Sequence, residues 1–394
     1  MACVHRDNPK DFHLRDDLSA PGADVSLALH QSVGVGLRPG HSVQLLQDEQ
    51  ILLALEEEVG SARESLHMVA SPWLAGAASE RLTAALAARR PGVVCRVLVD
   101  AFHSPGFEEQ VAPRLARTGC EVRAFRPFPG AVVTFADERV EARNYRQLLI
   151  RDGRVGLTGG AGVGPAWRDT YVRVEGAATR ELQQAFATSW HEAGGSLLPD
   201  SAFPPPTASG EARAAFVAST GSPSLSHSER LTQLLIASAR GRLWLTNGCF
   251  VPSRATLDML IHKARRGVDV RVLVPGPGHG ANPRALAAQR SLYERLLEGG
   301  VRIWEYQPSR LQARTVLVDE RLAAVGSMNL ELHAHATLEE GALVAEDPGL
   351  AHTLAETFER DLASAVEVRR EEWRSRGLFE RFTAPLPRSD GGCQ

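Results

Sequence analysis

The chain repeats itself, and this internal repeat constrains its fold more than any other feature. Residues 93–100 read VVCRVLVD and residues 268–275 read VDVRVLVP, each an apolar strand-like run that follows a glycine. A helical pattern and a further short strand come next in both places, at 119–125 (GCEVRAF) and at 300–306 (GVRIWEY). Because the segments recur in the same order, the sequence predicts two copies of one strand–helix unit.

The rest of the repeat indicates the fold class. Each half next presents a short strand that ends in aspartate and a glycine-bearing turn, at 148–160 and at 315–327. Each half then closes with a helical pattern, at 182–190 and at 354–362. Short apolar strands that alternate with amphipathic helices are typical of layered α/β proteins. We therefore expect an α/β fold with two similar halves, each a mixed sheet flanked by helices.

Composition predicts where the halves are separated. Residues 196–226 contain FPPPTASGE and STGSPSLS, and this content of proline, serine and glycine favours a linker or a long surface loop. The first half is expected at 41–195 and the second at 227–387, after an irregular extension at 1–40 and before a short tail at 388–394. Two independent domains of similar fold would give the same pattern.

Charge argues against a protein that binds nucleic acid. The 44 lysines and arginines are outnumbered by 47 acidic residues, which gives a net charge of −3. Nucleic-acid binders usually carry a basic surplus or a basic stripe. The arginine runs at 88–92, 263–267 and 368–376 are short, and such runs are usually solvated helix faces.

The cysteines and the apolar segments predict a compartment. The five cysteines form no C-x-x-C pair, and Cys95 and Cys120 lie in strand-like runs where free cysteine behaves as a small hydrophobe. This pattern favours a reducing compartment. Met1–Ala20 has no apolar core of a signal peptide, and no stretch approaches the ~18 apolar residues of a spanning helix. We expect a cytoplasmic protein, and contact with a membrane surface is compatible with this.

Two further segments carry a family resemblance. The second half contains QARTVLVD at 312–319 followed by GSMN at 326–329, and the first contains YRQLLIRD at 145–152 followed by GGAG at 159–162. These segments resemble the two H-x-K-x-x-x-x-D motifs, each with its glycine turn and asparagine, of the phospholipase D superfamily, in particular bacterial cardiolipin synthases. The resemblance runs from about His41 to Pro387. It implies two halves packed with pseudo-two-fold symmetry around a central cleft.

The resemblance also implies a mechanism from which this sequence departs. In the family, one histidine from each half faces the phosphodiester; one attacks phosphorus, and the other protonates the leaving alcohol. The lysines and asparagines bind phosphate oxygens. Here the histidine positions hold Tyr145 and Gln312, and the lysine positions hold Gln147 and Arg314. The first asparagine position is Gly162.

These substitutions remove the groups on which the family mechanism depends. An amide does not titrate near neutral pH, so Gln312 cannot act as a nucleophile or a proton carrier. Tyr145 has an ordinary pKa near ~10 and would need strong activation to attack phosphorus. We therefore expect a divergent phospholipase D-like protein, both of whose motifs are degenerate. Its cleft would bind an anionic or phosphate-bearing small molecule, or a phospholipid headgroup, or serve another reaction.

The resemblance assigns further residues to the cleft. The expected ligand-binding residues are Gln147, Arg314, Ser327 and Asn329, and arginine matches a phosphate oxyanion well. The expected supporting residues are Asp152, Asp319 and Glu340, of which Glu340 matches a family glutamate that commonly supports the second histidine. No metal or other cofactor is expected.

Two histidines outside the motifs leave an active enzyme open as an alternative. His103 and His279 follow the equivalent strands of the repeat, and loops at the carboxyl ends of strands are where α/β sheets bind ligands. They would form a relocated acid/base pair, or a weak metal site, and an active phosphodiesterase or phosphatidyltransferase could alternatively use Tyr145 as a replacement nucleophile. The alternative for both histidines is an exposed loop position. A third hypothesis is a non-catalytic partner of an active homologue.

His333 and His335 could hold a metal ion if they lie on one strand face, but a polar strand edge explains the same spacing. The sequence gives no indication of the oligomeric state.

Overall fold

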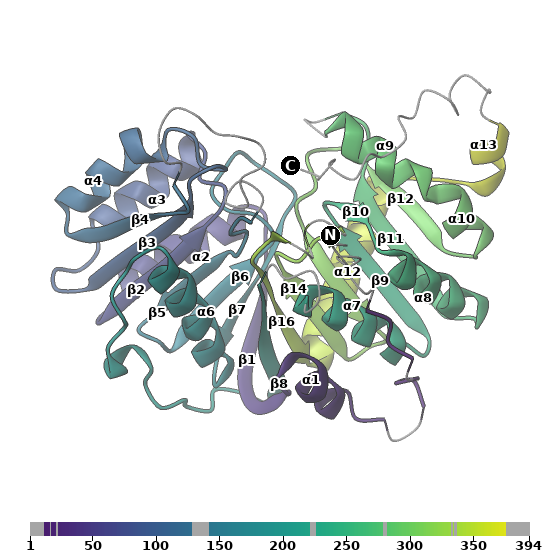
Figure 1. Cartoon of the computed structure of the whole chain (residues 1–394), viewed down its shortest axis with the longest axis horizontal. Helices are drawn as coiled ribbons and strands as arrows, with labels where there is room; N and C mark the ends of the chain where they lie inside the picture. The colour runs from purple at the N-terminus through teal and green to yellow at the C-terminus, as the bar shows by residue number, and fades with distance from the viewer. Residues whose placement is uncertain are drawn as a thin grey trace, which may run out of the picture.

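The computed structural model describes residues 12–375, except 16, 21–22, 128–141, 221–225, 279–281, 332–333 and 335–336. Figure 1 shows the first half on the left and the second half on the right, with β1, β8 and β16 between them.

The first helix, α1 (Val25–Val33), precedes the first half and packs against the second. The helices and strands of the first half are β1 (Arg38–Gln47), α2 (Glu49–Ser61), β2 (Ser65–Ala70), α3 (Ala77–Ala87), β3 (Val94–Asp100), a π-helical turn (Phe107–Val111), α4 (Ala112–Arg117), β4 (Cys120–Phe125), β5 (Leu148–Arg151), β6 (Val155–Gly159), β7 (Thr170–Glu175) and α6 (Ala178–Glu192). After a short 3-10 turn (Asp200–Ala202), the second half has β8 (Ala212–Ser219), α7 (His227–Ser238), β9 (Arg242–Asn247), β10 (Phe250–Val251), α8 (Arg254–Arg265), β11 (Asp269–Pro275), α9 (Pro283–Ser291), α10 (Tyr293–Glu298), β12 (Arg302–Tyr306), β13 (Arg314–Val318), β14 (Leu322–Gly326), β15 (Leu330–Glu331), β16 (Glu340–Glu346), α12 (Pro348–Ala363), β17 (Ala365–Glu367) and α13 (Arg370–Ser375).

The strand order confirms the predicted repeat. One mixed sheet of 15 strands runs β17-β12-β11-β9-β13-β14-β16-β8-β1-β7-β6-β5-β2-β3-β4. The order β4-β3-β2-β5-β6-β7-β1 in the first half is matched by β12-β11-β9-β13-β14-β16-β8 in the second. In both halves the three outermost strands of this series pair in parallel, and the others pair antiparallel. The fold is therefore α/β with two similar halves.

The two half-sheets join through β1 and β8. These strands pair antiparallel, with Arg38 opposite Ala214 and His41 opposite Ala212. β8 lies within the segment 196–226 that composition predicts to be a linker, and it is buried between β1 and β16. α1 likewise falls in the segment 1–40 that was expected to be irregular. The sequence did not predict this central strand, ARAAFVAS, because the segments on either side of it are rich in proline and serine.

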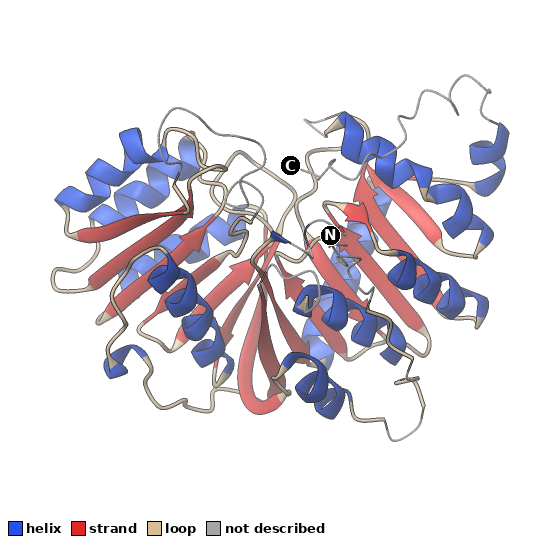
Figure 2. Ribbon diagram, viewed as in Figure 1, coloured by secondary structure: helices blue, strands red, loops and turns tan. Residues whose placement is uncertain are grey.

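Apolar side chains form three packed layers between helices and strands. α2, α3 and α4 cover one face of the first half, and α1, α7, α8 and α10 cover one face of the second. The middle core contains residues of α6 and α12 together with strands of both halves, among them Phe186, Trp190, Trp244 and Phe358. Figure 2 shows helices on both sides of the strands. This middle core contains side chains of both halves, so the two halves pack against each other through a common apolar layer.

The aspartates at the end of each motif play equivalent structural parts. Asp152 has a φ of 54° and Asp319 a φ of 53°. The Asp152 carboxylate accepts hydrogen bonds from the backbone N–H groups of Arg63, Glu64 and Ser65. The Asp319 carboxylate does the same for Arg240, Gly241 and Arg242. Each aspartate therefore fixes the start of the neighbouring strand, β2 or β9.

The expectation of free cysteines in β3 and β4 is wrong. Cys95 and Cys120 sit opposite each other on these parallel strands and form a disulfide. Each lies in a buried, strand-like run, which is also what a small hydrophobe would show, so the sequence pattern did not distinguish the two. In the part of the chain that the structure describes, no helix is both long enough and apolar enough to cross a bilayer.

Candidate functional site

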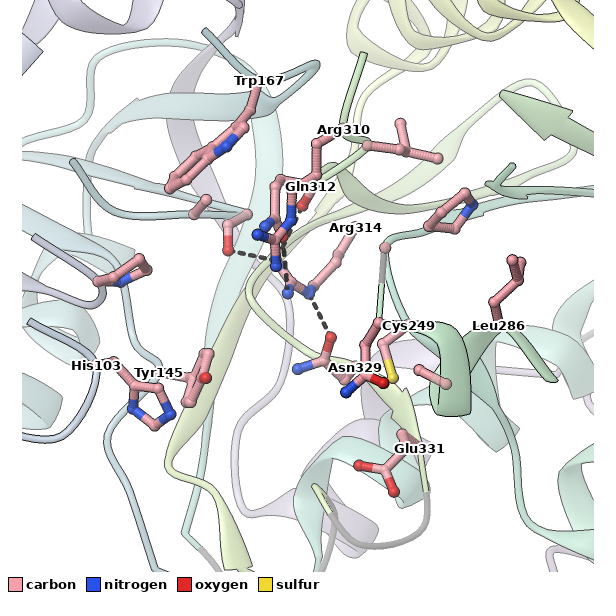
Figure 3. A pocket seen from close by; sticks show the side chains of 18 of the residues that line it. His103, Tyr145, Trp167, Cys249, Leu286, Arg310, Gln312, Arg314, Asn329 and Glu331 are labelled. Carbon is pink, nitrogen blue, oxygen red and sulfur yellow. Dashed lines mark hydrogen bonds between the residues drawn. The ribbon is translucent and has the colours of Figure 1, made fainter. Parts of the chain in front are cut away.

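The candidate site is a cavity of about 230 Å³ between the halves. Ser71 follows β2 and His103 follows β3, while Gly248 follows β9 and Gly276 follows β11; all four line it. It therefore opens at the carboxyl ends of the parallel strands of both halves, where α/β sheets bind ligands. Figure 3 shows His103 and Tyr145 on one side and Cys249, Leu286 and Glu331 on the other, with Arg314 between them.

Arg314, the first residue of β13, occupies the centre of the cavity. Its Nε donates to Asn329 Oδ1 at 2.6 Å, and its Nη1 donates to the carbonyl oxygens of Gly160 at 2.5 Å and Gln312 at 2.9 Å. Burial lowers the pKa of the guanidinium, while the carboxylates of Asp169 and Glu340 act to raise it. Arginine remains charged under such shifts, so the site contains a rigidly held cation.

Two buried carboxyl groups flank this cation at equivalent positions. Gly159 pairs with Tyr171 in one half and Gly326 with Ala342 in the other, which makes Asp169 the counterpart of Glu340. Burial raises the pKa of Asp169 to about 6 and that of Glu340 to about 7.

Each carboxylate fastens the turn that follows its half's glycine. Asp169 accepts from the backbone N–H groups of Ala161 and Thr170 at 2.8 and 2.7 Å. Glu340 accepts from the backbone N–H and the Nδ2 of Asn329 at 2.9 and 2.8 Å. The motif comparison identified Glu340 but missed Asp169, which only the strand register reveals.

Asn329 lines the cavity, whereas Ser327 does not. Ser327 Oγ accepts from the Gly341 backbone N–H at 3.1 Å and is fully buried between β14 and β16. Its hydroxyl therefore fastens two strands together.

Gln147 is also committed to the backbone. Its Oε1 accepts from Ser71 N–H at 3.1 Å, and its Nε2 donates to the carbonyl oxygens of Ser71 and Tyr145. At the first asparagine position, a Cβ added to Gly162 would lie 2.2 Å from the Pro72 carbonyl oxygen. The segment after β2 thus packs where the first half's lysine and asparagine are expected, and neither Gln147 nor Ser327 lines the cavity.

Tyr145 packs against a histidine held by a carboxylate. The rings of His103 and Tyr145 meet edge to face with centroids 4.5 Å apart. His103 Nδ1 lies 2.9 Å from Oδ1 of Asp100, which is fully buried, while Asp100 Oδ2 accepts from Asn144 N–H at 3.0 Å. Burial, and next the negative charge of Asp100, raise the pKa of Tyr145 well above its ordinary value. The phenol therefore ionises less readily here than in water.

Gln312 and its neighbours complete the wall from the second half. The Gln312 N–H donates to the Arg168 carbonyl at 2.9 Å, and its Oε1 lies 3.4 Å from Arg314 Nη2. Arg310 and Trp167 also line the cavity and are labelled in Figure 3. Arg310 is exposed, and it forms no side-chain hydrogen bond or ion pair with any residue that the structure describes. Neither residue lies at a position of the two H-x-K-x-x-x-x-D motifs or their glycine turns, so the motifs did not identify them.

Three of the histidines considered from the sequence, His279, His333 and His335, lie outside the described residues. Among the residues that are described, no group of three or more histidines, cysteines or carboxylates could hold a metal ion. Asp152 and Asp319 lie at the opposite ends of their strands from the cavity.

Comparisons with known proteins agree with the geometry. Residues 233–362 match the family model described as cardiolipin synthase, PLD-like domain. Cardiolipin synthase A of Pectobacterium atrosepticum is 31% identical over 401 residues, covering 92% of this chain and 79% of that protein. Cardiolipin synthase A of Pseudomonas aeruginosa is 33% identical over 296 residues, covering 72% of this chain and 59% of that protein.

Among solved structures, phosphatidylserine synthase of Haemophilus influenzae superposes with a TM-score of 0.68 at 11% identity, covering 91% of this chain and 94% of that one. This likeness concerns the fold alone.

Proposed function

The chain belongs to the cardiolipin synthase group of phospholipase D-like proteins, and from this premise we propose that its cleft binds a phosphate-bearing headgroup without the two-histidine transfer reaction. The relatives named above are synthases of cardiolipin and phosphatidylserine, which makes a phospholipid headgroup the first ligand to test. The observation that carries the proposal is the fixed guanidinium of Arg314 at the centre of the cavity.

Three features support phosphate as the ligand. Arg314 is oriented by Asn329 and two backbone carbonyls, so its ordering costs little at the moment of binding. Arg310 provides a second cation at the cavity wall. Charge-assisted hydrogen bonds from arginine are among the stronger contacts that a phosphate can make.

The absence of the two-histidine reaction is supported by the state of the motif positions. Tyr145 is less acidic than a free phenol, and Gln312 has no titratable group. The side-chain amide of Gln147, at the first lysine position, is hydrogen-bonded to the backbone N–H and carbonyl of Ser71. A headgroup in the cavity would therefore meet cations from the second half but no pair of histidines at the motif positions.

Binding is tested by calorimetric titration with inorganic phosphate and with glycerol 1-phosphate. We expect Arg314→Gln to weaken binding by about tenfold or more, since hydrogen bonds to charged groups contribute about 1.5–3 kcal/mol each. Arg310→Gln should weaken binding less. Because Arg310 is exposed, this variant should fold normally and still tests the site if Arg314→Gln does not fold. Arg321→Gln is the control, because Arg321 pairs with Glu346 on the surface. Unchanged affinity in both cavity variants would refute the proposal.

A second candidate function is hydrolysis of a phosphate ester with His103 as the acid/base group. The pairing of His103 with buried Asp100 favours it, because a carboxylate on Nδ1 fixes the tautomer and orientation of an imidazole. A phosphodiesterase assay on wild type, His103→Asn and Tyr145→Phe separates the hypotheses. Turnover lost only in His103→Asn would establish this candidate. A covalent phosphate on Tyr145 would instead support the tyrosine nucleophile and contradict our main proposal.

A further inference from the structure

An apolar groove of about 360 Å³ lies next to the cavity. Ile51, Leu52 and Leu55 of α2 line one side, Ala77 and Ala78 at the start of α3 line another, and the loop 162–167 closes it. Leu52 and Ala78 are half-buried, and Ala77 is exposed, so the groove is open to solvent.

The groove and the cavity are separated by a single loop. Gly160 and Ala161 line the cavity, residues 162–166 line the groove, and the Trp167 side chain borders both. The loop is anchored to the segment after β2, because Val163 N–H donates to the Pro72 carbonyl and Leu74 N–H donates to the Val163 carbonyl. The two hollows therefore have a fixed relative position, joined at Trp167.

The charged groups that line the two hollows differ. Arg314 and Arg310 line the cavity together with the carboxyl of Glu331, whereas the charged groups that line the groove are the carboxyls of Asp48, Glu49 and Asp169. Asp48 accepts from Arg168 and from the Asp169 N–H, so this carboxylate is held in place. A phosphate is attracted to the cavity and repelled from the groove, which leaves the groove to an uncharged, aliphatic part of the same ligand.

We propose that this groove, formed by α2, the start of α3 and the loop 162–167, holds one alkyl chain of an amphiphile whose phosphate sits in the cavity. The inference rests on the proposed phosphate site, because it uses that site to fix the head of the ligand. The occupant is an alkyl chain because Ile51, Leu52 and Leu55 give the groove an apolar wall, and Trp167, which lines both hollows, places the chain beside the phosphate.

The test measures how affinity depends on chain length. Inorganic phosphate and butyl, hexyl and octyl phosphate are titrated into the full chain below their micelle-forming concentrations. We expect affinity to rise by about fourfold for each CH₂ that becomes buried.

A matched pair of variants on α2 locates the chain. Leu52→Glu places a charge in the groove, whereas Leu53→Glu places the same charge at a neighbouring residue that is 51% exposed and does not line the groove. We expect Leu52→Glu to abolish the dependence on chain length and Leu53→Glu to retain it. Ala78→Phe fills the groove without adding charge, so it should also abolish the dependence of affinity on chain length. It tests the groove independently if Leu52→Glu does not fold.

The outcomes distinguish the inference from the proposed function. If inorganic phosphate binds but affinity does not rise with chain length, the groove is not a chain site and the phosphate site stands. If chain length matters equally in both α2 variants and in Ala78→Phe, the chain lies elsewhere and the inference is wrong. If no phosphate compound binds, the proposed function itself fails.

Discussion

The buried carboxyl of Glu340 gives a quantitative prediction about pH and stability. Glu340 is fully buried beside Asn329 and Ser228, and burial raises its pKa from 4.5 to about 7. The folded protein therefore binds this proton more tightly than the unfolded chain does. Its contribution to stability is present at acidic pH and is lost as the pH rises through the range from about 4.5 to 7.

The size of the effect follows from that shift. One pKa unit corresponds to about 1.4 kcal/mol, and most of the shift is expressed between pH 5 and pH 8. Over this interval Glu340 should remove about 2–3 kcal/mol from the free energy of unfolding. Glu340→Gln keeps a carbonyl oxygen for Asn329 and cannot ionise, so its stability should not contain this loss.

The measurement is urea unfolding of both proteins at pH 5 and pH 8, followed by the difference between their pH dependences. Other titrating groups, including Asp169, are common to both proteins and cancel. Glu320→Gln, at an exposed turn residue, serves as the control and should follow the wild type. Equal pH dependences for wild type and Glu340→Gln would mean that this carboxyl ionises as it does in water, and the reasoning from burial would be refuted.

Three further predictions concern the scaffold. Asp152→Ala and Asp319→Ala should each lower the free energy of unfolding by about 2 kcal/mol, because each leaves backbone N–H groups at a strand start without an acceptor; thermal melts with the Asn variants as controls check this, and an effect in only one half would contradict the equivalence. Removing the Cys95–Cys120 disulfide, which spans a sequence separation of 25 residues, should cost about 3 kcal/mol; melts of the wild type and a C95S/C120S variant, both without reductant, measure it, and equal stability of the two proteins would contradict the prediction. Gly162→Asn should destabilise the protein and alter the cavity, because its Cβ would lie 2.2 Å from the Pro72 carbonyl; normal stability with unchanged phosphate binding would show that the segment after β2 moves aside easily.

The α/β architecture with two similar halves could be predicted from the sequence, because the same order of apolar strand-like runs and helical patterns occurs twice. The strands at 94–100 and 269–275 occupy equivalent positions in the two half-sheets. β8 was not predicted, because burial between two strands is a tertiary property that its prolines and serines on either side conceal.

The candidate site was only partly accessible from motifs. Motif positions identified Arg314, Asn329 and Glu340, which lie together at the centre of the site. They also identified Ser327 and Gln147, whose polar atoms instead bind backbone. Arg310 and Trp167 line the cavity because of the paths of the loops that carry them, and a local sequence pattern does not predict such paths.

The two ends of each eight-residue motif serve different purposes, and this separation has a consequence for how such proteins change over time. Asp152 and Asp319 hold the starts of β2 and β9, whereas positions 145 and 312 are in the cavity at the other end of the strands. A lineage can therefore exchange its reactive groups without loosening the scaffold, because the residues that secure the fold are not those that touch a ligand. A substitution at position 145 or 312 is therefore expected to act on the cavity while the aspartates continue to hold the starts of β2 and β9.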